Sequence, residues 1–372
     1  MFTSHFPSSK NFRRSLLAAS GLTALLAFAG CNESATVSTG PDSLDSNAVS
    51  GVLSNVSQNV IYATYVDLDA KTALLQTAIT ALVNTPTDSN LHLAQQAWRN
   101  ARAADEADEG FLFGPVENLG VDANTDAWPL NETDLNGELA SNDSLTKVFI
   151  DGVSPNLKGY HTIEYLIFGE TGTKTAAQIT ARERQYLVAT TASLKGLNDA
   201  MANAWNPTGG NFVGAFQNAG KGSGVYMSQT QALEDLLNGV VGICDEVSTG
   251  KIAEPFNEQN DVKEESRFSD NSDADFANNI RSVQNVFLGT YFGMTGNGLG
   301  LKTLILAQKD TATATLIETQ TNTAIAAIQA MTPTFHSAIF NNKAKVQAAI
   351  DAVTALKVTL SSVKVKNELG LQ

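Results

Sequence analysis

Apolar residues recur every three or four positions in two long stretches of this 372-residue chain, one near each end. Steps of three and four place such side chains along one face of an α-helix that packs into a bundle. Strand-like alternation of apolar and polar residues is nowhere sustained. The two sets are Ile61, Tyr65, Leu68, Thr72, Leu75, Ile79 and Leu82, and Val346, Ile350, Val353, Leu356, Leu360 and Val363. We therefore expect an all-α protein.

The same helical period predicts further helices between these two stretches. They cover residues 89–109, 175–204, 226–247, 273–290 and 310–330. The turn-forming run Asn206-Pro207-Thr208-Gly209-Gly210 falls near the middle and is the best candidate for a domain boundary. Each side is long enough for four or five bundle helices. We expect two helical-bundle domains, 51–208 and 209–372.

The charge of the chain excludes one class of partner. It contains 24 basic and 38 acidic residues, a formal net charge of −14. An acidic surface repels phosphate backbones, so nucleic acid is not expected as a partner. The same charge suits a protein that handles cations.

The N-terminus has the order of a bacterial lipoprotein signal. Residues 1–30 contain Lys10, Arg13 and Arg14 but no acidic residue, followed by an apolar run that ends Ala29-Gly30-Cys31. We expect cleavage before Cys31, which would then carry the lipid, and the polar residues 31–50 would form a flexible tether to the membrane. Ordinary signal-peptidase cleavage near Ala29 is the alternative. Asn32 resembles an outer-membrane sorting signal, so the expected location is the cell envelope, facing the periplasm or the cell surface.

His161 and Glu164 form the densest chemical signal. In a helix, residues three apart share a face, and nearly all neighbours of this pair are bulky and apolar. A buried imidazole and a buried carboxylate each need a partner. A bound metal ion would supply one. A mutual hydrogen bond that merely orients two helices is the plainer alternative.

A second acidic group, Glu106 and Glu109, lies on a helix expected to end at Gly114-Pro115. It is either a solvated helix end or a set of carboxylates that faces His161 and Glu164. Asp126 is a further possible ligand, although the stretch around it fails as an EF-hand loop. Oxygen-rich ligands favour hard cations such as ferric iron, calcium or manganese over zinc.

The remaining reactive side chains point to no other chemistry. The chain has no HExxH zinc motif and no GxSxG elbow. His92 and His336 are expected to be solvated, and Cys244 is expected to be a core residue.

Four motifs in this order resemble the imelysin family, helical envelope proteins also described as insulin-cleaving metalloproteinases and iron-regulated proteins. The GxHxxE signature is Gly159, His161 and Glu164. The other three are Trp98 and Arg102 leading to Glu109 and the turn Phe111-Leu112-Phe113-Gly114-Pro115; Asp126 with Trp128 and Pro129; and Glu265-Ser266-Arg267-Phe268-Ser269.

The resemblance implies two helical bundles separated by a cleft that the HxxE motif lines, and a relation to EfeO-type iron-uptake proteins. It implies Glu109, His161 and Glu164 as the first metal ligands, with Glu106 and Asp126 next. Arg267 and Trp128 would line the cleft. The expected cargo is a divalent or ferric ion, iron before zinc, manganese or calcium, with an envelope iron transporter as a possible partner. Two alternatives stay open, a metallopeptidase that uses the same site and a metal-free protein that binds peptides or glycans.

Overall fold

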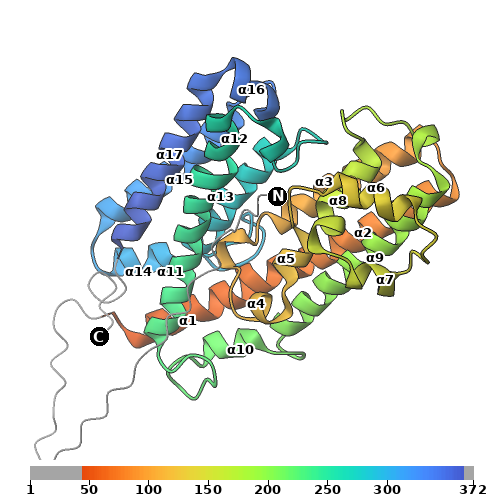
Figure 1. The fold of residues 1–372 in the computed structure, drawn as a ribbon. Coiled ribbons are helices and arrows are strands. Elements are labelled where there is room, and N and C mark those ends of the chain that lie inside the picture. The colour runs from red at the N-terminus through yellow and green to blue at the C-terminus, as the bar shows by residue number, and fades with distance from the viewer. Residues whose placement is uncertain (1–43, 364–372) are drawn as a thin grey trace, which may run out of the picture. The chain divides into compact units, whose positions relative to one another are not determined.

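The structure is a computed structural model that describes residues 44–363, and it is built from helices (Figure 1). The helices are α1 (Ser46–Asn55), α2 (Tyr62–Asn84), α3 (Asp88–Asp105), α4 (Pro115–Leu119), α5 (Val121–Thr125), α6 (Glu132–Ala140), α7 (Lys147–Gly152), α8 (Gly159–Phe168), α9 (Ala181–Trp205), α10 (Phe212–Gln217), α11 (Gln229–Glu246), α12 (Ala253–Glu258), α13 (Ser272–Leu288), α14 (Leu301–Ala307), α15 (Thr311–Gln329), α16 (Phe335–Asn341) and α17 (Lys343–Ser362). Residues 44–363 contain no β-strand, only one isolated bridge between Tyr291 and Thr295. The all-α prediction is confirmed for this part of the chain.

The two apolar stretches form α2 and α17, as predicted. The apolar side chains of α2 are buried where the helix packs against α3 and α9. Those of α17 are buried against α11 and α15, and α13 packs between the same two helices. The first half of the chain therefore contributes one group of long helices and the second half another.

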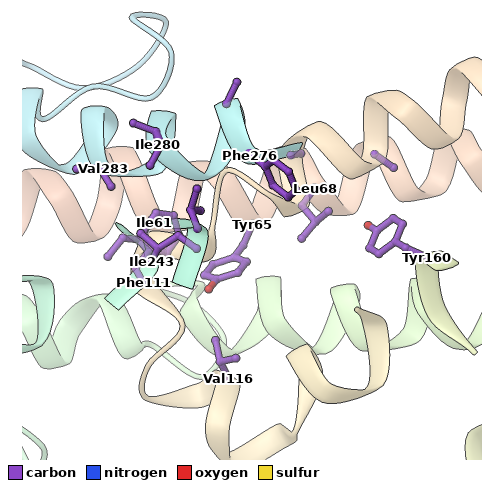
Figure 2. Close-up of a cluster of buried hydrophobic side chains, with 14 of the residues drawn as sticks. Ile61, Tyr65, Leu68, Phe111, Val116, Tyr160, Ile243, Phe276, Ile280 and Val283 are labelled. Carbon is purple, nitrogen blue, oxygen red and sulfur yellow. The ribbon is translucent and has the colours of Figure 1, made fainter. Parts of the chain in front are cut away.

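One apolar core joins these two groups of helices. In Figure 2, Tyr65 and Leu68 of α2 lie near Ile243 of α11 and Phe276, Ile280 and Val283 of α13. Phe111 contacts Tyr65 edge to face, with ring centroids 5.9 Å apart. The short turn Glu109–Phe111 packs on both α11 and α13. The predicted division at 208/209 falls in the turn after α9, and it stays a prediction.

The structure departs from the expected helices in three places. The helix predicted over 89–109 ends at Asp105, because the following turn must let Gly110 approach α13, where a Cβ would lie 2.6 Å from the Ser282 Oγ. The helix predicted from 175 begins at Ala181, where the Thr180 side chain caps it. Residues 46–50, part of the expected tether, are the first residues of α1.

The predicted signal peptide and Cys31 lie outside the described residues. None of the helices in residues 44–363 combines the length and the apolar character that crossing a membrane requires.

Candidate metal centre

The position of His161 depends on a glycine at the start of α8. Gly159 has φ +78°, and a Cβ there would lie 2.1 Å from the carbonyl oxygen of Thr125. Only glycine permits this approach and this backbone conformation. Because Thr125 ends α5 and Asp126 follows it, the contact brings Asp126 beside His161. The His161 Nε2 lies 3.1 Å from the Asp126 Oδ1.

Glu164 lies one helical turn after His161 and orients its ring. The Glu164 Oε2 is 3.0 Å from the His161 Nδ1. The other oxygen, Oε1, accepts hydrogen bonds from the backbone N–H of Ser269 at 2.9 Å and from its hydroxyl at 2.7 Å. Both carboxylate oxygens are therefore occupied. A carboxylate that holds one ring nitrogen leaves the other free for a metal, as in many metal-binding histidines.

His161, Asp126 and Glu265 form what we call the inner centre. One ligand atom from each of the three lies within 4.8 Å of the other two. Within residues 44–363, the buried Glu265 Oε2 has no hydrogen-bond partner, and the buried His161 Nε2 has none besides the Asp126 Oδ1 at 3.1 Å. One nitrogen and two carboxylate groups thus converge on a single place.

Two buried cations surround the inner centre. The guanidinium of Arg102 contacts Asp105 at 2.8 Å and Glu265 at 3.0 Å, and it also pairs with Glu106 and Asp126. The Lys251 ammonium, at the end of the π-helical turn Val247–Lys251, lies 3.0 Å from the Glu265 Oε1. Both side chains are almost fully buried. They hold the carboxylates in place by charge.

The electrostatics of the inner centre favour an ionised pair. Burial lowers the pKa of His161, but hydrogen bonds to Asp126 and Glu164 outweigh it and raise the pKa to about 10. Burial raises the pKa of Asp126, but Arg102 and His161 together bring it well below its ordinary value. Burial raises the pKa of Glu265. A metal ion at the centre would replace the proton on His161.

Comparison with known proteins gives the family. The imelysin family model matches residues 61–363, most of the chain. The chain belongs to the imelysin family. Iron-regulated protein A of Synechococcus elongatus is 28% identical over 301 residues, which are 80% of each chain.

Two solved structures share the imelysin fold. A protein assigned as an iron-regulated protein A precursor from Parabacteroides distasonis superposes with a TM-score of 0.77 at 22% identity, over 86% of this chain and 95% of its own. An imelysin-like protein from Psychrobacter arcticum superposes with a TM-score of 0.71 at 14% identity, over 88% of this chain and 98% of its own. At these identities the likeness establishes the fold alone.

The structure of this imelysin brings some predicted site residues together and separates others. His161 and Asp126 meet, and Glu164 supports His161 from the side. Glu106 instead pairs with Arg102 and accepts from Asn279. A ligand atom of Glu109 groups with atoms of Asp122 and Asp126, in a set that does not include His161.

Arg267 and Trp128 were expected to line the cleft, and this stays a prediction. Arg267 pairs with Glu132 and with Glu170 at 3.0 Å, and its guanidinium covers the Phe268 ring. Trp128 is partly buried and precedes Pro129 in a cis peptide bond. Neither lines the pocket beside Asp126.

The other two histidines and the cysteine of the described chain lie away from the inner centre. His92 is exposed, and His336 is partly exposed with its Nδ1 3.0 Å from Glu264. Cys244 is buried in α11, and burial raises the pKa of its thiol to about 12.

Three residues of the centre escaped prediction. Glu265 and Ser269 belong to the fourth imelysin-like motif, residues 265–269, in which a role was assigned from the sequence only to Arg267. The polar residues repeated in that motif were the available signal. Nothing in the local sequence marks Lys251.

Proposed function

We propose that this imelysin binds a metal ion at the inner centre as part of iron acquisition at the bacterial cell envelope, where a lipid on Cys31 anchors it. The observation that carries the proposal is that ligand atoms of His161, Asp126 and Glu265 lie within 4.8 Å of one another, while among the described residues the buried Glu265 Oε2 lacks a hydrogen-bond partner and the His161 Nε2 has only Asp126. Buried polar atoms are normally satisfied, and a metal ion would satisfy both.

The ligand chemistry fits iron but is not exclusive to it. An imidazole with carboxylates binds iron, manganese or zinc, and a site rich in carboxylates leans to the harder ions. The Synechococcus relative is called iron-regulated, which supports iron as the cargo. In this proposal the ion is captured and handed on, with an envelope iron transporter as the partner.

The test is the metal content of the full-length protein, purified in detergent and dialysed against iron, zinc, manganese or calcium. Mass-spectrometric metal analysis would compare the wild type with His161→Ala. His92→Ala is the matched control, because His92 is exposed. We expect one equivalent of a transition metal in the wild type and the control, and an affinity at least tenfold lower in His161→Ala.

Equal metal content in all three proteins would overturn the inner centre. If the wild type binds no transition metal, the alternative of a metal-free protein that binds peptides or glycans is favoured. Cleavage of a peptide library that His161→Ala abolishes would favour the metallopeptidase instead.

A further inference from the structure

A pocket beside the inner centre contains two carboxylates, those of Asp108 and Asp122, that make no ion pair within residues 44–363. Its cavity volume is about 10 Å³, close to what one water molecule needs, and it lies among the turn after α3, the helices α4 and α5, and the facing sides of α2 and α9. Asp108, Glu109, Asp122, Asp126 and Tyr65 are the residues of this outer pocket that matter here. His161 does not line it.

The acidic side chains of the outer pocket converge. Ligand oxygens of Glu109, Asp122 and Asp126 lie within 4.8 Å of one another. Glu109 and Asp108 are more than nine-tenths buried, whereas Asp122 is exposed. Such a grouping would let an ion enter from the Asp122 side and meet buried ligands behind it.

Of the acidic residues in this pocket, Asp126 pairs with Arg102, whereas the others receive little positive charge from the described residues. Neither Asp108 nor Asp122 makes an ion pair within residues 44–363, and the Lys251 ammonium lies 3.8 Å from the Glu109 Oε1. Burial, and the charges of Asp105 and Asp122, hold the pKa of Asp108 well above its ordinary value. Buried carboxylates are normally paired or bound to a metal.

An independent observation also points into the outer pocket. The Tyr65 side chain is 1% exposed, and its hydroxyl has no hydrogen-bond partner in the described part of the chain. Figure 2 shows this hydroxyl directed to the side on which Val116, another lining residue, lies. The side-chain oxygen of Asn198, also in the lining, is buried and unpartnered as well. Both are neutral oxygens of the kind that complete a cation's shell.

We propose that the outer pocket is a second cation site, selective for a hard divalent ion, in which Glu109, Asp122 and Asp126 bind the ion, Asp126 is shared with the inner centre, and Asp108 in the pocket lining adds negative charge. All its donors are oxygens, the set that calcium and manganese prefer, and it contains no imidazole. The proposal does not depend on a role in iron acquisition. It gives the protein two sites of different chemistry with one carboxylate between them.

Calcium is the probe that separates the two sites, because it avoids nitrogen ligands. Isothermal titration of the full-length protein in detergent should show calcium binding with a dissociation constant of roughly 10⁻⁴ to 10⁻³ M. We expect Asp108→Asn and Asp122→Asn each to lower the affinity for calcium at least tenfold. His161→Ala should change the dissociation constant for calcium by no more than about twofold, since the histidine is not a ligand of the outer pocket.

Asp143→Asn is the matched control, an exposed aspartate outside the pocket. Tyr65→Phe removes one neutral oxygen and should weaken calcium binding roughly fivefold. Circular dichroism of each variant would show that the fold is retained.

No calcium binding by the wild type, or equal binding in the wild type, Asp108→Asn and Asp122→Asn, would overturn the outer site. Loss of calcium binding in His161→Ala would also overturn it, because one shared site would then explain the data. Failure of the inner centre would appear differently, as transition-metal binding unaffected by His161→Ala.

Discussion

The inner centre and the outer pocket contain the same kinds of acidic side chain in opposite states of charge compensation. Around His161, the carboxylates contact Arg102, Lys251 or the hydroxyl of Ser269. In the outer pocket, Asp108 and Asp122 have no such partner within residues 44–363. The inner centre therefore keeps its geometry without a metal, whereas the outer pocket should depend on an ion or on protons. The pairing of carboxylates with cations and hydrogen-bond donors, more than their number, distinguishes a preformed site from one in which the carboxylates repel each other.

The largest expected effect on stability comes from removing the buried cation that pairs with the carboxylates of the inner centre. Arg102→Met would leave carboxylates from five residues, Asp105, Glu106, Asp126, Glu265 and Asp275, without their shared cation. We expect the free energy of unfolding to fall by about 3–5 kcal/mol, measured by denaturant titration of the metal-free protein.

Arg281→Met is the control for this change. Arg281 is partly buried, and its guanidinium donates only to Asn278 among the described residues. Its loss should lower the free energy of unfolding by less than about 1 kcal/mol. Similar losses in the two variants would mean that Arg102 does not hold the inner centre together.

A smaller effect is expected where backbone geometry fixes the inner centre. Gly159→Ala places a Cβ against the Thr125 carbonyl and strains a positive φ, so we expect a loss of about 1–3 kcal/mol in the free energy of unfolding. Transition-metal affinity should fall at the same time, because α8 must move away from Asp126. Calcium binding at the outer pocket should change less.

Gly137→Ala is the counterpart inside α6, where an added Cβ meets nothing within 4 Å. It should leave metal binding unchanged and stabilise the protein by about 0.5–1 kcal/mol. Unaltered transition-metal affinity in Gly159→Ala would contradict the view that this glycine sets the distance between His161 and Asp126.

The smallest expected effect is the pH dependence of the metal-free protein. Asp122 is exposed as a residue, but partial desolvation of its carboxylate in the pocket and the charge of Asp126 raise its pKa to about 6, so the folded state binds this proton more tightly than the unfolded state. Stability should therefore rise as pH falls from about 6 to about 4, near the unfolded value. The raised pKa of His161 also makes the folded protein more stable as pH falls, in this case from about 10 to the pKa of histidine in the unfolded chain.

Thermal unfolding across this range would test the prediction. Acidification from pH 7.5 to 5 should raise the melting temperature of the metal-free protein and abolish the stabilisation by calcium, because protons and ions compete for the same oxygens. Asp122→Asn should flatten the profile below pH 6. A metal-free protein that is less stable at pH 5 would contradict an uncompensated outer pocket.

The sequence was sufficient for the long helices and for part of the inner centre. Helices such as α2 and α17 follow from their apolar spacing alone. Short helices such as α4 and α5 are too brief for a period to show, and yet α5 positions Asp126. The helix end at Asp105 depends on Gly110 meeting α13, a contact that no local pattern records.

The role of Glu164 illustrates what spacing leaves undecided. Three residues after His161, it can be a ligand or an orienting group. Which of these two roles Glu164 takes depends on Ser269, which donates hydrogen bonds to the second oxygen of the Glu164 carboxylate. Glu265 was missed for the same reason, since its nearness to His161 is a property of the tertiary fold. Glu106 was expected either at a solvated helix end or among the carboxylates that face His161, and in the structure it is buried and pairs with Arg102.

The contact between Glu164 and Ser269 joins residues 105 positions apart in the chain. A nascent or truncated chain that ends before this segment contains His161 but has no assembled centre. Metal capture must then wait until synthesis is complete and both halves have docked. For an envelope protein that crosses the inner membrane unfolded, the choice of ion would fall to the compartment in which folding finishes. Delayed assembly would thereby protect the protein from taking up the wrong metal on its way out of the cytoplasm.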